Sequence, residues 1–187
     1  TLEQVTLVDI DPQMTTISKT QPQMLQINQG SLNHPKVKIV HQDAYKFVET
    51  NSQFYDAIII DLPDPSYTAL GKLYSLSFYE LLKKRLSVRG VLVTQSTSPF
   101  FAKDAFWCIH KTMAAAGFHV YPYHTDVPSF GDWGFQLGTL NPIAPEKLKL
   151  ILPTENYLFL TQPLLSTLFA FPQDVQIDLE TLDINTL

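Results

Sequence analysis

Short apolar runs rich in β-branched residues alternate with amphipathic stretches over the first 140 residues of the chain. The apolar runs predict strands over residues 5–10, 37–41, 55–61 and 91–95. The stretches between and after them predict helices that open at Pro12, near residue 45, at residue 77 and at residue 103. Because strands that alternate with helices need crossover connections, the pattern favours an α/β fold with a mostly parallel sheet.

The central and later elements add detail to this picture. The strand over residues 55–61 contains four consecutive apolar residues without alternation, which predicts burial on both of its faces. The helix over residues 77–86 has a predicted buried stripe formed by Phe78, Leu81, Leu82 and Leu86. The next helix ends at Gly117, and the runs 118–124 and 133–137 predict an antiparallel pair at one edge of the sheet.

The alternation lapses after residue 140, which bears on domain organisation. A chain of 187 residues fits one ordinary domain. We therefore expect an α/β domain over residues 1–140 and a C-terminal appendage over residues 141–187 packed on it, with short helices near 145–150 and 163–169. Since the first residues already lead into a strand, we expect the chain to begin inside a domain.

Composition and charge exclude several classes of protein. With 45% apolar and 17% charged residues, the chain is too rich in core-forming residues to be disordered. A net charge of −5, with no basic cluster beyond residues 83–85, argues against nucleic-acid binding. The single cysteine, Cys108, excludes a disulfide framework and a zinc cluster, and the five histidines lack metal-ligand spacing, so no metal is expected. No run approaches the roughly 20 apolar residues of a membrane span.

Acidic residues follow three of the predicted strands. Asp9 ends the first strand, Asp43 lies two residues after the second, and Asp61 ends the third with Asp64 three residues later. Any one of these residues could be a helix cap or a turn former, and Asp11 before Pro12 is best explained as a cap. Together they favour a ligand site, because ligands of open α/β sheets bind beyond the carboxyl ends of the strands.

The order of these acids suits a nucleoside with a cationic end. An acid in the position of Asp9 accepts hydrogen bonds from ribose hydroxyls, and Asp43 could accept from an exocyclic adenine amino group. That leaves Asp61 and Asp64, in a loop stiffened by proline, to hold an ammonium group or to accept a proton from an amine that becomes a nucleophile. A rigid turn with a capping acid is the alternative for this loop.

The ordered set of short motifs resembles the spermidine synthase family over about residues 5 to 138. The matching segments are Val8-Asp9-Ile10-Asp11, Gln42-Asp43-Ala44, Asp61-Leu62-Pro63-Asp64-Pro65, Leu73-Tyr74-Ser75, Phe78-Tyr79, Thr94-Gln95-Ser96 and Trp133-Gly134-Phe135. The resemblance implies a class I methyltransferase-like, Rossmann-like fold. It also implies an aminopropyltransferase that moves the aminopropyl group of decarboxylated S-adenosylmethionine onto putrescine and releases methylthioadenosine.

The resemblance also assigns roles to individual residues. By position, Asp9 matches the ribose-binding acid, Asp43 with Ala44 the adenine-binding segment, Asp61 the proton-accepting catalytic acid and Asp64 an amine-binding acid. The substrate-lining positions fall on Tyr74, Gln95, Asp132 and Trp133. We expect decarboxylated S-adenosylmethionine as a co-substrate with no permanently bound cofactor, a small-molecule polyamine as partner, and a homodimer.

The C-terminal tail looks like that of a bacterial subgroup in which this domain follows several membrane helices. It implies a cytoplasmic location, as the cytoplasmic domain of an inner-membrane protein.

Two departures from the family pattern bear on activity. The family's first strand and its Gly-rich loop are absent, since the chain starts at what matches the second strand. A tyrosine that usually precedes the Trp-Gly-Phe motif is replaced by Phe130, with Asp132 nearby, which leaves the acceptor amine open.

Two other functions stay open. The first is an S-adenosylmethionine-dependent methyltransferase, although a second acid would repel the methionine carboxylate of the intact cofactor. The second is a non-catalytic domain that binds a polyamine or a nucleoside.

Overall fold

The computed structural model describes residues 2–150 and 158–187, and the chain divides into two compact units, Thr1–Ser52 and Gln53–Leu187. Among the described residues, the first unit contains a two-stranded sheet and the second a four-stranded sheet. This division falls at a different place from the boundary at residue 140 that the sequence suggests, and that boundary stays a prediction.

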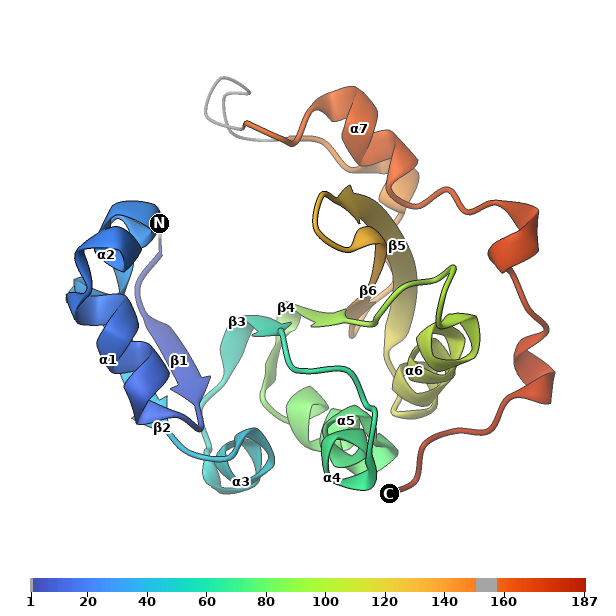
Figure 1. Cartoon of the computed structure of the whole chain (residues 1–187). Helices are drawn as coiled ribbons and strands as arrows, with labels where there is room; N and C mark the ends of the chain where they lie inside the picture. Colours follow the sequence, from blue (N-terminus) through green and yellow to red (C-terminus); the bar gives the residue numbers. More distant parts are fainter. Residues whose placement is uncertain (1, 151–157) are drawn as a thin grey trace. The chain divides into compact units, whose positions relative to one another are not determined.

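The first unit is a strand–helix–strand arrangement followed by a helix. Strand β1 (Val5–Asp9) pairs in parallel with β2 (Val37–His41), and Asp9 lies opposite His41. The connection contains α1 (Pro12–Thr20), α2 (Pro22–Asn28) and the 3₁₀ turn η1 (Ser31–Asn33), and α3 (Ala44–Thr50) follows β2 (Figure 1). Asp11 caps α1 by accepting a hydrogen bond from the backbone N of Gln13 at 2.8 Å, with Pro12 at the first helical position, so the predicted cap is confirmed.

The second unit is built on a mixed sheet with the strand order β3-β4-β6-β5 among the described residues. Strand β3 (Tyr55–Ile60) is parallel to β4 (Leu86–Gln95), whereas β6 (Gly131–Thr139) is antiparallel to both β4 and the edge strand β5 (His119–Val127). The predicted α/β fold and its antiparallel edge are therefore confirmed.

Helices and turns complete the second unit. They are α4 (Thr68–Gly71), η2 (Lys72–Tyr74), α5 (Leu76–Lys83), α6 (Lys103–Ala115), η3 (Pro145–Lys147), α7 (Gln162–Thr167), η5 (Gln173–Val175) and η6 (Leu179–Thr181). The core lies where α5 and α6 pack on the sheet: Phe78, Tyr79, Phe106, Leu92 and Met113 are almost completely buried. Within residues 2–150 and 158–187, no helix has both the length and the apolar content needed to cross a membrane.

The expectation that β3 is buried on both faces is wrong. Ile60 is buried at 7% exposure, but Ile59 on the opposite face is 78% exposed. Neighbouring strand β4 shows the same one-sided pattern, with Leu92 buried and Val91 37% exposed. Ile60 and Leu92 lie on the same face of the sheet, so the apolar run in β3 is buried on that face and not on both.

Helix α5 ends earlier than the apolar stripe predicts. It stops at Lys83, and Leu86 is the first residue of β4 rather than the last turn of the helix. Leu86 is nonetheless buried, at 3% exposure, because the strand carries it under the same core. The prediction that Leu86 is buried is therefore correct, although the residue belongs to a strand and not to the helix.

The C-terminal tail runs alongside α6 (Figure 1). Side chains of that helix donate hydrogen bonds to the backbone of the tail. Trp107 donates its indole N–H to the Val175 carbonyl at 2.7 Å, and Lys111 donates to the Leu179 carbonyl at 2.7 Å. The backbone N of Asn185 donates to Oγ1 of Thr112 at 3.0 Å. The two predicted tail helices correspond to the 3₁₀ turn η3 and to α7.

Burial of His110 on α6 makes the stability of the second unit depend on pH. Burial lowers the pKa of His110 below its ordinary 6.5, although the hydrogen bond to Gln136 acts in the opposite direction. Since the unfolded chain binds a proton near pH 6.5 and the folded one only at lower pH, the free energy of unfolding should fall as pH drops below about 6.5. Urea unfolding between pH 7.5 and 5.5 measures this loss.

The matched variant for this prediction is His110→Asn. Nδ1 of His110 lies 3.1 Å from Oε1 of Gln136, so it carries the hydrogen, and an asparagine amide can donate in the same direction. The variant has no proton to gain at low pH, so it should lose less stability than the wild type between pH 7.5 and 5.5. An identical pH dependence in both proteins would contradict the assignment.

Candidate active site

The carboxyl ends of β3 and β4 lie side by side at one edge of the sheet in the second unit. These strands are parallel neighbours, with Ile60 opposite Thr94. Asp61 therefore begins its loop next to Gln95, the last residue of β4. Crossover topology places the ligand crevice of such sheets at this edge, so the loop 61–67 and Gln95 are the first components of the candidate site.

Gln95 joins this loop to the core through its side-chain amide. The side chain is 5% exposed, and its Nε2 lies 2.6 Å from the Leu62 carbonyl oxygen, 3.0 Å from Oδ1 of Asp64 and 2.9 Å from the Tyr74 hydroxyl. Its Oε1 accepts from the backbone N of Thr97 at 2.9 Å. Since a backbone N–H can only donate, this contact fixes which end of the amide faces the loop.

Tyr74 is the second buried anchor of the loop. Its side chain is 1% exposed, and its hydroxyl lies 3.0 Å from the Leu62 carbonyl oxygen and 3.2 Å from that of Pro63. Burial raises the pKa of Tyr74 well above its ordinary value, the Gln95 hydrogen bond lowers it, and the Asp64 and Asp61 carboxylates raise it further. The phenol therefore keeps its proton at neutral pH and donates it to a loop carbonyl.

The two acids of the loop have different surroundings. Asp64 is half-buried and held by Gln95, whereas Asp61 is exposed at the end of β3. Among the described residues, no hydrogen bond or ion pair involves the Asp61 carboxylate. One carboxylate is thus fixed in place and the other is open to solvent and to a ligand, a pairing suited to binding a cation and accepting a proton.

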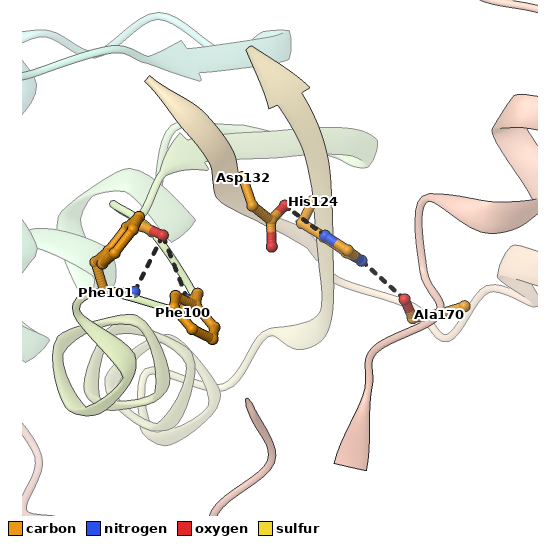
Figure 2. A network of polar contacts seen from close by, with 6 residues as sticks. Phe100, Phe101, His124, Asp132 and Ala170 are labelled. Carbon is orange, nitrogen blue, oxygen red and sulfur yellow. Dashed lines mark hydrogen bonds and ion pairs between the residues drawn. The ribbon is translucent and has the colours of Figure 1, made fainter. Parts of the chain in front are cut away.

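Asp132 and Trp133 lie at the start of β6 and have partners of their own. Figure 2 shows Asp132 facing His124 of β5, with Oδ1 of Asp132 2.6 Å from Nδ1 of His124. The other ring nitrogen of His124 lies 2.8 Å from the Ala170 carbonyl oxygen. Trp133 packs against Phe130, with ring centroids 5.1 Å apart. The described contacts join neither residue to Gln95 or Tyr74, so their role as substrate-binding residues stays a prediction.

The segment after Gln95 has a feature that the sequence does not reveal. Thr97 has a φ of 60°, in the left-handed region that is rare for a β-branched residue. Gly134 holds it there: the Gly134 N donates to the Thr97 carbonyl at 2.7 Å, and the Ser96 N donates to the Gly134 carbonyl at 2.8 Å. Nothing local to Thr97 signals this conformation, although the Trp-Gly-Phe motif contains the glycine that supports it.

The predicted nucleoside-binding residues belong to the first unit. Asp9 and Asp43 follow the parallel strands β1 and β2, and the backbone N of Gln42 donates to the Asp9 carbonyl at 3.2 Å. Oδ1 of Asp9 accepts from the Asp11 N at 2.7 Å, and Oδ1 of Asp43 caps α3 by accepting from the Lys46 N at 2.9 Å. Ala44 is the first residue of α3. Asp43 therefore acts as a helix cap, which was the alternative explanation for an acid at this position. A nucleoside-binding role for these residues stays a prediction.

The described residues contain no group of three or more His, Cys, Asp or Glu side chains arranged to hold a metal ion. A hollow of about 370 Å³ lies between the 65–74 segment, α6 and the tail, and its lining includes Tyr74, Cys108 and Asn185. It is lined mainly by apolar atoms. The polar side chains described at the candidate site are the carboxylates of Asp61 and Asp64, the Gln95 amide and the Tyr74 phenol.

Parallel strands joined by helices, with carboxylates at the strand ends, define an α/β protein with a class I methyltransferase-like fold. The solved structure of spermidine synthase from Thermotoga maritima has this fold: it aligns with a TM-score of 0.74 at 21% identity over 92% of this chain and 59% of that one. A spermidine synthase in complex with the transition state analogue AdoDATO aligns equally well, with a TM-score of 0.74 at 22% identity over 92% of this chain and 60% of that one.

The sequence matches the spermine/spermidine synthase domain over residues 1–144, and the chain belongs to this family. It is 40% identical over 190 residues to the polyamine aminopropyltransferase of Leptospira interrogans, covering 97% of this chain and 36% of that protein. It is 43% identical over 170 residues to polyamine aminopropyltransferase 1 of Streptomyces coelicolor, covering 91% of this chain and 32% of that protein. The chain thus spans about a third of the length of these curated relatives.

Proposed function

We propose that this chain is the nucleoside- and amine-binding part of a polyamine aminopropyltransferase. The full-length protein would transfer the aminopropyl group of decarboxylated S-adenosylmethionine, bound as a co-substrate, to a polyamine acceptor such as putrescine. The observation that carries the proposal is the contrast within one loop, where Asp64 is held by Gln95 at 3.0 Å and Asp61 stands exposed at the end of β3. Family membership and the names of the relatives support it.

The chemistry follows from the charges involved. An alkylamine with a pKa of about 10 is protonated at neutral pH and must lose that proton before its nitrogen can attack carbon. Asp61 accepts the proton, and Asp64 holds the other, still charged, amine of the acceptor. The new C–N bond forms as the C–S bond of the sulfonium breaks. The electron pair of the broken C–S bond stays on sulfur, and the product is neutral methylthioadenosine.

The test is an assay of the full-length protein with decarboxylated S-adenosylmethionine and putrescine. We expect methylthioadenosine and spermidine in equal amounts, measured by liquid chromatography. S-adenosylhomocysteine formed from intact S-adenosylmethionine would identify a methyltransferase instead. Binding of methylthioadenosine without turnover on any of a panel of di- and triamines would identify a non-catalytic domain, and either outcome overturns the proposal.

Asp9, in the first unit, provides a separate prediction about nucleoside binding. We propose that its carboxylate accepts hydrogen bonds from the ribose hydroxyls, and a hydrogen bond to a charged group contributes roughly 1.5–3 kcal/mol. Asp9→Asn should therefore weaken methylthioadenosine binding to the full-length protein by about 10- to 100-fold, measured by isothermal titration. The isosteric amide keeps an oxygen that can accept from the Asp11 N.

Asp11→Asn is the matched control. Asp11 lies two residues further on and caps α1, a role that asparagine also performs. Unchanged affinity in this variant together with weakened affinity in Asp9→Asn would assign the ribose contact. Equal affinity in Asp9→Asn and wild type would contradict it.

We also propose a homodimer and a cytoplasmic location, with a membrane tether in the full-length protein. The free thiol of Cys108, which makes no disulfide, suits a reducing compartment. Sedimentation of the full-length protein with and without detergent tests the dimer and the tether together. A monomer, or full recovery in the soluble fraction without detergent, would contradict the corresponding part.

A further inference from the structure

Tyr74 is placed to act on the candidate site without touching a substrate. Its side chain is 1% exposed, and its hydroxyl is occupied by Gln95 at 2.9 Å and by the Leu62 and Pro63 carbonyls at 3.0 and 3.2 Å. Tyr74 borders the apolar hollow described above, but with its hydroxyl occupied by these contacts it has no polar group to offer a substrate in this conformation. This differs from the substrate-lining role that the family resemblance implies for it.

The direction of each hydrogen bond in this cluster can be deduced from its partners. Gln95 Nε2 donates, because its Oε1 already accepts from the Thr97 N. The Tyr74 oxygen therefore accepts from Gln95, and its single hydrogen is donated to a carbonyl of Leu62 or Pro63, since carbonyls can only accept. The result is a directed chain of hydrogen bonds from the backbone N of Thr97, just after β4, through two side chains to the backbone of the loop.

The loop itself has few other means of staying in place. Pro63 and Pro65 have no N–H, so the backbone on both sides of Asp64 lacks donors that could anchor it. The Ser66 N donates to the Asp64 carbonyl at 2.7 Å, a contact that stays within the turn. Tyr74 and Gln95 supply the described contacts that tie residues 62–64 to the core.

We propose that Tyr74 is a positioning residue, which together with Gln95 fixes the turn 62–64 and so presents the Asp64 carboxylate in one orientation to the acceptor amine. The proposal rests on the proposed function for the identity of that amine. It assigns Tyr74 to the specificity for the acceptor and not to the nucleoside donor. Its hydroxyl acts through the loop backbone, whereas Gln95 contacts Asp64 directly.

The kinetic test compares Tyr74→Phe with wild type in the full-length protein. Phenylalanine removes the hydrogen that Tyr74 donates to the Leu62 or Pro63 carbonyl, and we expect the KM for the acceptor amine to rise about tenfold while the KM for the donor stays unchanged. A variant that was merely less well folded would lose kcat and keep both KM values. Equal changes in the two KM values, or no change in either, would overturn the proposal.

A double-mutant cycle tests whether Tyr74 works through Asp64. In the Asp64→Asn background, Tyr74→Phe should have little further effect on the acceptor KM, because the group that it positions has lost its charge. Multiplicative effects of the two substitutions would show that Tyr74 acts independently of Asp64 and would overturn the proposal.

Tyr79→Phe is the matched control, since Tyr79 lies on the adjacent helix α5 and is 0% exposed. Its hydroxyl interacts with Thr94 and not with the loop 61–67, so the control removes a buried phenol oxygen without breaking a link to the loop. Tyr79→Phe should leave both KM values unchanged. A tenfold rise in acceptor KM in this variant too would mean that any buried phenol gives the effect, and the proposal would fail.

A ligand-free measurement separates this proposal from the proposed function. Hydrogen exchange of the Ser66 amide, which reports on the turn through its bond to the Asp64 carbonyl, should be about tenfold faster in Tyr74→Phe than in wild type or Tyr79→Phe. Unchanged exchange would overturn the positioning role. If exchange responds as expected but the wild type makes no methylthioadenosine, the positioning of the loop stands and the proposed aminopropyl transfer fails.

Discussion

Replacing Asp61 by asparagine in the full-length protein should lower kcat for aminopropyl transfer by about 10²- to 10⁴-fold, the usual contribution of a general base. Asp61 follows the last residue of β3, and its carboxylate is exposed where the strand ends. Asparagine has the same shape and can still accept a hydrogen bond, but its amide cannot take the proton of an attacking amine. The rate of methylthioadenosine release at saturating donor and acceptor measures the loss.

The control for this substitution is Asp56→Asn on the same strand. Asp56 lies near the opposite end of β3, where Oδ1 accepts from the Ser87 hydroxyl at 2.8 Å, and the amide oxygen can accept this bond equally well. Its kcat should match that of wild type. Methylthioadenosine should bind Asp61→Asn and wild type alike, so an Asp61→Asn enzyme that keeps its kcat, or one that also loses the nucleoside, would contradict the assigned role.

Much of the fold follows from the hydrophobic pattern, because the positions that carry it are local. The strands ending at Asp9 and Ile60 and the cap at Asp11 depend on residues within one turn or one strand, and the structure has all three. The burial of each face of the sheet, in contrast, depends on residues that are distant in the sequence. Ile59 has the same apolar character as its neighbours, yet it is 78% exposed whereas Ile60, on the opposite face, is 7% exposed.

The candidate site likewise has features that local sequence predicts and features that depend on contacts between distant residues. That acids stand at strand ends can be read from the sequence, but the contacts that distinguish Asp61 from Asp64 cannot. Gln95 reaches Asp64 across 31 positions and Tyr74 across 21, through the parallel register of β3 and β4. The pairing of Asp132 with His124 likewise depends on the antiparallel register, in which His124 lies opposite Gly134 and Asp132 is its diagonal neighbour.

Gly134→Ala should be among the most destabilising single substitutions in the second unit, with a loss of about 3 kcal/mol in the free energy of unfolding. A Cβ at this position would lie 2.6 Å from Cδ2 of Phe106 and 2.9 Å from the Thr97 carbonyl oxygen. Phe106 is completely buried and cannot turn away, and the Thr97 carbonyl is the acceptor of the Gly134 N–H. Urea unfolding followed by tryptophan fluorescence measures the loss.

Gly138→Ala on the same strand separates steric overlap from the general cost of adding a methyl group. The new Cβ would meet Cε of Met113 at 2.9 Å and Cδ1 of Phe118 at 3.1 Å, and the end of a methionine side chain can move aside. This variant should lose about 1 kcal/mol. Because Gly134 also holds Thr97 in its left-handed conformation next to Gln95, Gly134→Ala should raise the KM for the acceptor as well, whereas Gly138→Ala should not. Equal losses of stability in the two variants would show that Phe106 and Thr97 relax as readily as Met113, and that the segment after Gln95 is not held by contact with Gly134.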